Sequence, residues 1–310
     1  MMYTIARFGS TCRTDSDQLS DQDLLIICPP HRKADLLNKY QQQNYSVSFF
    51  TERQLEKMQE KGSLFLQHLK TESQVIADSD GEFRRFIDSC DFIPPQASEL
   101  RQCETALTTV LAWPNDPRTD TWKADWLYCV LRDYLVKRLA TKGSLAFGVS
   151  DITKAAKKEW GLSVSQIRCL LQLRLNKALY REKASSGKFE SSLFSEVKYL
   201  IEAIGFLGQE ITFEYPVQLE SLDSSLNTNY QWLRALEGVY ILAVSAGYTH
   251  PSHKKLMRMI QNPNLYHSSS NVMHRKVRSY YYDVIHAVTA NKAMQPTPIP
   301  LRCAALHSGG

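Results

Sequence analysis

The sequence predicts an α+β protein, in which a small mixed-sheet domain over residues 1–95 precedes a larger all-α helical domain over residues 96–290. Short apolar segments alternate with helical ones up to Pro94-Pro95, and beyond this point apolar residues recur at helical spacing. A chain of 310 residues with 43% hydrophobic and 22% charged residues is long enough for two ordinary cores. Residues 291–310 are rich in proline and are expected to form a disordered tail.

The first 95 residues are expected to form four short strands joined by helices. Apolar, β-branched and aromatic residues bounded by turn residues predict the strands, over residues 3–8, 21–28, 45–50 and 75–77. Apolar residues spaced along one face predict helices over residues 32–43 and 63–71. Thr51 is expected to cap a further helix, because its hydroxyl can accept a hydrogen bond from a backbone amide of the first turn.

The region after Pro94-Pro95 is expected to be a helical bundle. Apolar residues at helical spacing form five stripes, over residues 100–110, 122–139, 167–179, 193–204 and 232–243. We interpret these stripes as the core of the bundle. The segment 250–290 carries six lysines and arginines against one acid, with three consecutive tyrosines beside them. A solvated helix face is favoured there, and binding of a nucleic-acid backbone is the alternative.

The amino-acid composition indicates the cellular compartment and limits the kinds of partner to expect. The net charge of +5 is only a weak indication of an anionic partner. Seven cysteines without a CxxC pair are typical of free thiols in a reducing cytosol, so the protein is expected to be cytoplasmic. The first ten residues lack the apolar segment of a signal peptide. The longest apolar run, residues 239–246, is far too short to span a bilayer, so no membrane is expected as a partner.

Two short motifs lie at the ends of the first two predicted strands. Gly9-Ser10 closes the first strand, while Asp21 and Asp23 open the second. Residues i and i+2 of a strand face the same side, so these two carboxylates would repel each other unless a cation such as Mg²⁺ or Mn²⁺ neutralised them. Gly9 permits a close backbone approach, and Ser10 offers a hydroxyl and an amide near an expected helix start, which suits a phosphate. The spacing therefore predicts a phosphate seat beside a metal-binding pair, as phosphoryl or nucleotidyl transfer requires.

The segment RFGSTCRTDSDQLSDQDLLIIC resembles the signature of the DNA polymerase β-type nucleotidyltransferase superfamily, particularly of its small bacterial members with a helical domain. The segment GSLFLQHLKTESQVIADSDG is similar to the helix and strand that close the domain in some of them. The resemblance implies that Gly9 and Ser10 hold the triphosphate and that Asp21 and Asp23 bind two metal ions. A nucleoside monophosphate would pass from an NTP to an acceptor hydroxyl of a small molecule, a protein or an RNA. Arg13 is a further candidate for phosphate contact.

The chain departs from this family at the third carboxylate, which the family usually carries on a later strand. Alternation places Ser48 in that position, or Ser46 if the register shifts, and neither is acidic. Glu52 is an alternative source of the missing carboxylate. A catalytically impaired nucleotide-binding module with a protein partner, in a toxin–antitoxin or phage-defence system, is therefore the alternative function.

Two remaining features are interpreted without a role in catalysis. His68 lies at the edge of an apolar helix face and is interpreted as a hydrogen-bonded structural residue. The final segment NKAMQPTPIPLRCAALHSGG resembles read-through into the recombination site of an integron gene cassette. This resemblance implies a mobile bacterial gene and says nothing of the reaction.

Overall fold

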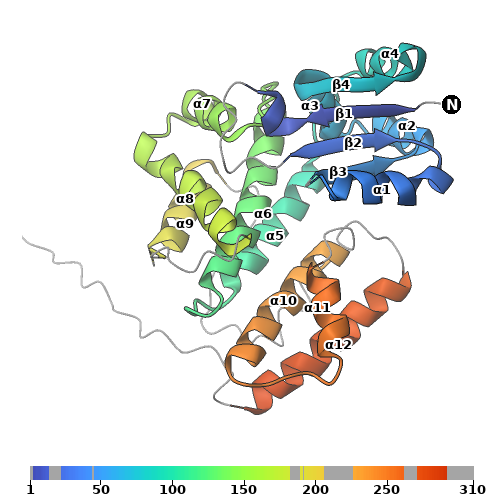
Figure 1. The fold of residues 1–310 in the computed structure, drawn as a ribbon. Helices are drawn as coiled ribbons and strands as arrows, with labels where there is room; N and C mark the ends of the chain where they lie inside the picture. The colour runs from blue at the N-terminus through green and yellow to red at the C-terminus, as the bar shows by residue number, and fades with distance from the viewer. Residues whose placement is uncertain are drawn as a thin grey trace, which may run out of the picture. The chain divides into compact units, whose positions relative to one another are not determined.

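The computed structural model describes residues 3–13, 22–43, 45–181, 189–190, 192–205, 226–261 and 271–291. Within this part, four strands form one mixed sheet in the order β3-β2-β1-β4 (Figure 1). The strands are β1 (Thr4–Phe8), β2 (Asp23–Ile27), β3 (Ser46–Phe50) and β4 (Ser73–Asp78). The central strand β1 is antiparallel to both neighbours, β2 and β4, whereas β2 and β3 run parallel. All four predicted strands are confirmed, with no end shifted by more than two residues.

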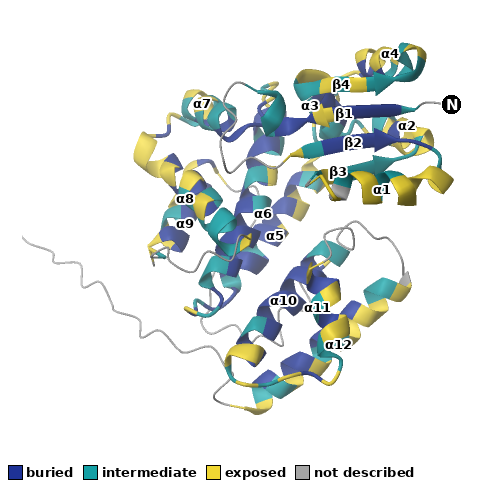
Figure 2. Ribbon diagram, in the orientation of Figure 1, coloured by how far each residue is buried: buried dark blue, intermediate teal, exposed yellow. Residues whose placement is uncertain are grey.

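Helices cover both faces of the sheet. One face packs Leu25 and Ile27 against Leu55, Leu66 and residues of the helices α2 (Glu52–Glu60), α3 (Leu64–Glu72) and α4 (Glu82–Ser89). The other face packs Leu24 and Ile26 against α1 (Lys33–Gln41). Figure 2 shows the consequence of this double cover, because β1 and β2 are buried over most of their length. The two-sided burial explains why β2 is an uninterrupted apolar run.

Thr51 caps α2 as the sequence predicts. Its side-chain oxygen accepts from the Gln54 backbone amide at 3.3 Å, and the Gln54 side chain accepts from the Thr51 amide at 2.8 Å. This reciprocal pair satisfies two amides that the first turn of a helix leaves without partners. The cap fixes where β3 ends and α2 begins.

The rest of the described chain is helical, which confirms the α+β class. The helices are α5 (Ala97–Ala112), α6 (Asp120–Ala140), α7 (Val149–Trp160), α8 (Val164–Arg181), α9 (Leu193–Ala203), α10 (Asn229–Ser245), α11 (His253–Gln261) and α12 (Asn271–Ala290). In the C-terminal part, α10 packs against α12 and α11. No helix in the described part of the chain is both long and apolar enough to span a membrane.

The chain divides into two compact units. The first comprises residues 1–103, 131–175 and 195–207, and it contains the whole sheet. The second comprises residues 104–130, 176–194 and 208–310. Several long helices, α6 and α8 among them, contribute to both units. The predicted domain boundary at Pro94-Pro95 stays a prediction, and residues 292–310 of the predicted tail lie outside the described residues.

Candidate functional site

The antiparallel pairing of β1 and β2 brings Gly9 of the first predicted motif beside Asp23 of the second. Phe8 pairs with Asp23 across the antiparallel ladder, so Gly9 follows directly beside the aspartate. Gly9 is buried and has φ of +75°, a conformation that side-chain-bearing residues rarely adopt. A β-carbon on Gly9 would lie 3.3 Å from Asp23 Oδ2, closer than ordinary packing allows. Glycine at this position therefore leaves a small space directly beside the carboxylate.

The segment after Gly9 differs from the expected helix start. Gly9–Cys12 forms a single 3-10 turn, and Arg13 beyond it is extended. A turn of four residues lacks the aligned peptide dipoles with which a long helix attracts a phosphate. Of the groups expected to bind the phosphate, the backbone amide and the hydroxyl of Ser10 therefore remain. The Thr11 hydroxyl beside them is buried and has no hydrogen-bond partner among the described residues. Asp21, the other half of the predicted carboxylate pair, lies outside the described residues.

The position opposite Asp23 on the neighbouring strand is filled by a serine. In the parallel pairing of β2 and β3, Ser46 lies beside Asp23, and Ser48 lies beside Leu25, one pair further on. Side chains of paired residues project to the same face of a sheet. Ser46 and Ser48 therefore share the face of Asp23, and Ser46 is the nearer of the two. The strand β3 carries no acidic residue, so it offers no carboxylate beside Asp23.

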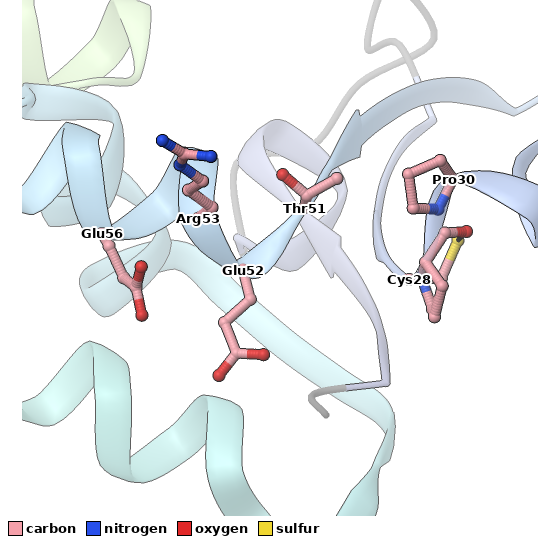
Figure 3. A pocket seen from close by; sticks show the side chains of 7 residues that line it. Cys28, Pro30, Thr51, Glu52, Arg53 and Glu56 are labelled. Atoms are coloured by element: carbon pink, nitrogen blue, oxygen red, sulfur yellow. Dashed lines mark hydrogen bonds between the residues drawn. The ribbon is translucent and has the colours of Figure 1, made fainter.

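Glu52 lies at the other end of these strands and does not supply the missing carboxylate. It follows Phe50 at the carboxyl ends of β2 and β3, while Asp23 and Ser46 open the same strands. A strand of five residues is about 16 Å long. Glu52 instead lines a separate hollow, where the start of α2 faces Cys28 and Pro30 (Figure 3). The alternative that Glu52 reaches Asp23 is therefore wrong.

A hydrogen-bonded chain of three side chains lies next to Gly9. His68 Nε2 and Glu72 Oε2, one turn apart on α3, are 3.1 Å apart. The Arg13 guanidinium donates to the same oxygen of Glu72 and forms an ion pair with it. Arg13 also passes so close to Gly148 that a β-carbon there would lie 2.7 Å from its Cζ. Glu72 thus holds Arg13, the predicted phosphate contact, in a fixed direction.

The His68 ring is held by aromatic contacts as well as by Glu72. It stacks on Phe147, with ring centroids 4.7 Å apart, and meets Phe8 edge to face. A β-carbon on Gly9 would lie 3.9 Å from His68 Cε1, so the imidazole borders the same space as Asp23. The interpretation of His68 as hydrogen-bonded is confirmed, but its place beside Gly9 was not foreseen. The spacing of His68 and Glu72, four residues apart on one helix, was the available signal.

Burial and hydrogen bonding shift the pKa of Glu72 in opposite directions. Its side chain is 10% exposed, and this burial raises the pKa of the carboxyl. The hydrogen bonds from His68 and Arg13 outweigh that effect, so the pKa lies below its ordinary value of 4.5. A depressed pKa means that the charged carboxylate stabilises the fold above about pH 4.5, and that this stabilisation is lost as the pH falls through the lower value.

Replacing Glu72 with glutamine is expected to lower the free energy of unfolding by about 1–3 kcal/mol at pH 7, because a buried, charge-assisted acceptor is lost. The difference from the wild type should shrink as the pH falls through the lowered pKa, where the wild-type carboxylate itself takes up a proton. Urea unfolding followed by circular dichroism at pH 7 and over a series of acid pH values measures this. Glu60→Gln, at an exposed position of α2, is the matched control and should change little. A pH-independent loss would contradict an ionic role for Glu72.

The described residues fit a divalent cation in part. Asp23 supplies a hard oxygen ligand beside the space at Gly9, as Mg²⁺ prefers. No group of three histidine, cysteine or acidic side chains gathers within the part of the chain that the structure describes. Since Asp21 lies outside that part, the predicted carboxylate pair stays a prediction.

Comparison of the chain with protein-family models, with curated proteins and with solved structures found no match. The resemblance to nucleotidyltransferases therefore depends on the motif residues alone. Fold and site together define an α+β protein in which the turn at Gly9, after β1, lies beside Asp23 on β2.

Proposed function

We propose that this chain is a metal-dependent nucleotidyltransferase that moves a nucleoside monophosphate from an NTP to an acceptor hydroxyl. The observation that carries the proposal is the approach of Gly9 to Asp23 across the β1–β2 pair. Gly9 and Asp23 are fourteen positions apart in the sequence, each is a weak signal alone, and they lie beside each other in the sheet. Their meeting is what a phosphate seat beside a metal-binding carboxylate requires.

Each residue has a defined task in this reaction. Asp23, together with Asp21, would bind Mg²⁺ or Mn²⁺, which neutralises charge on the triphosphate when bound. Gly9 leaves room for the phosphates, and the Ser10 amide and hydroxyl donate to them. The acceptor oxygen attacks the α-phosphorus, the bond to the bridging oxygen breaks, and pyrophosphate leaves with the electron pair. The acceptor proton passes to a base or to solvent.

A second candidate is a nucleotide-binding module with impaired chemistry, acting with a protein partner in a toxin–antitoxin or phage-defence system. The serine that lies beside Asp23 favours it, because Ser46 is a poor metal ligand and a poor base. Such a module would keep metal-dependent NTP binding without turnover. The two candidates therefore differ in a measurable step and share the same binding site.

The test is incubation of the full chain with each α-labelled NTP and Mg²⁺ or Mn²⁺, with cell extract as the source of acceptor. The proposed enzyme transfers label, and the labelled species identifies the acceptor as a small molecule, a protein or an RNA. Metal-dependent NTP binding without transfer would favour the second candidate. Absence of both binding and transfer would contradict the site itself.

A further inference from the structure

A second cavity lies wholly within the second unit. It has a volume of about 510 Å³ and is lined by residues of α8, α10 and α11. This volume lies in the range of pockets that hold small organic ligands. Figure 1 shows α10 and α11 side by side in the C-terminal part of the chain. The cavity shares no residue with the Gly9–Asp23 site, so an inference from it does not depend on the proposed function.

The polar side of this cavity is a network of buried charges. Arg234, 1% exposed, donates to Asp125 at 2.8 Å and to Glu237 at 2.7 Å. The Tyr180 hydroxyl donates to the other oxygen of Glu237 at 2.5 Å. Arg181 donates to both oxygens of Asp125 through Nε and Nη2, at 3.1 Å each. We call these five side chains the charged floor.

One guanidinium of the charged floor, that of Arg181, lines the cavity and is partly exposed. Asp125 is fully buried and Glu237 nearly so, and each of their oxygens accepts at least one hydrogen bond. Arg181 is different, because 43% of its side chain is exposed. Among the described residues its hydrogen bonds involve only Nε and Nη2, so Nη1 is directed to no acceptor there. A guanidinium held on one edge by a carboxylate is well placed to donate from its other edge.

Most of the remaining lining of the cavity is apolar. It consists of side chains from α10 and α11, namely Tyr240, Ile241, Val244, Met257 and Ile260. Val244 is 46% exposed, so this part of the lining is open to solvent. Two polar residues, Ser245 and Gln261, also line the cavity. A cavity lined by apolar side chains and by a partly exposed arginine is complementary to a molecule with an anionic head and an apolar body.

We propose that this cavity binds an amphipathic organic anion. Its carboxylate or phosphate accepts hydrogen bonds from Arg181, and its aliphatic or aromatic body packs against α10 and α11. Asp125 holds the Arg181 guanidinium in place, and the two arginines together balance the charges of Asp125 and Glu237. The anion is therefore held by hydrogen bonds from the outer edge of Arg181 and not by an excess of positive charge. A buried ion-pair network often contributes less to stability than well-packed apolar residues of the same volume. Binding of an anion would explain why this cavity has charged residues there instead.

The experiment titrates the full chain by calorimetry with dodecanoate, below its micelle concentration. Dodecyltrimethylammonium tests the same apolar body with a cationic head, and acetate tests the anionic head alone. We expect one dodecanoate per chain, bound at least about tenfold more tightly than either comparison ligand. Equal binding of the two dodecyl compounds, several weak sites or no saturable binding would each overturn the proposal. A phosphate ester, dodecyl phosphate, distinguishes the two head groups.

Two variants locate the bound anion. Arg181→Gln should weaken dodecanoate binding about tenfold or more, while Lys254→Gln, at an exposed position of α11 outside the cavity lining, should leave it unchanged. Val244→Glu places a carboxylate in the apolar lining at an already exposed position and should abolish binding with the helix content unchanged. Wild-type affinity in Val244→Glu would overturn the proposal even if Arg181→Gln failed to fold.

Discussion

Asparagine in place of Asp23 is expected to reduce nucleotidyl transfer by about 100-fold or more, because a metal-binding carboxylate contributes several kcal/mol to the transition state. Asparagine has nearly the same shape, and it keeps one oxygen beside Gly9. The loss should therefore come from charge rather than from packing. Initial rates of label transfer from the α-labelled NTP, at saturating Mg²⁺, measure the effect.

The matched control is Asp35→Asn, which removes the same charge from an exposed position of α1. It should transfer label at the wild-type rate, and both variants should show the circular dichroism spectrum of the wild type. If Asp23→Asn transferred label as fast as Asp35→Asn, the metal role of Asp23 would be wrong. If the wild type bound metal–NTP without turnover and Asp23→Asn lost that binding, the nucleotide-binding module would be favoured.

The strands and their order along the chain could be predicted because their signals are local. Apolar runs bounded by turn residues fixed β1 to β4 within two residues, and Thr51 was predicted as a cap from its own neighbours. The pairing of Phe8 with Asp23 was also within reach, because a hairpin joins adjacent strands. The 3-10 turn at Gly9 could not be predicted, because a glycine with positive φ can end a strand in several ways.

Contacts between distant segments could not be predicted from the sequence. Arg13 meets Glu72, 59 residues further on, and His68 stacks on Phe147 from a third segment. The charged floor is a stronger case, since α6 carries Asp125 between buried tryptophans that form an ordinary core stripe. Nothing local distinguishes a buried aspartate with two arginine partners from a solvated one. Only the fold reveals which charges are compensated.

Asparagine in place of Asp125 is expected to destabilise the second unit by about 3–5 kcal/mol, the usual cost of removing one partner from a buried ion pair. The Arg234 guanidinium, 1% exposed, would lose its ion pair with Asp125 and keep the one with Glu237. The asparagine amide would also place N–H donors against the donors of both arginines. Urea unfolding followed by tryptophan fluorescence suits this test, because four of the five tryptophans belong to the second unit.

The control for this prediction is Asp283→Asn in the same unit, where the carboxylate is 54% exposed and lies 3.8 Å from His250. A solvated carboxylate at this distance from its partner contributes at most about 1 kcal/mol, so the control should unfold close to the wild type. Equal stability of Asp125→Asn and Asp283→Asn would mean that water or another group compensates Arg234. The charged floor would then be too loosely held to direct Arg181 into the cavity, and the proposed anion site would lose its structural basis.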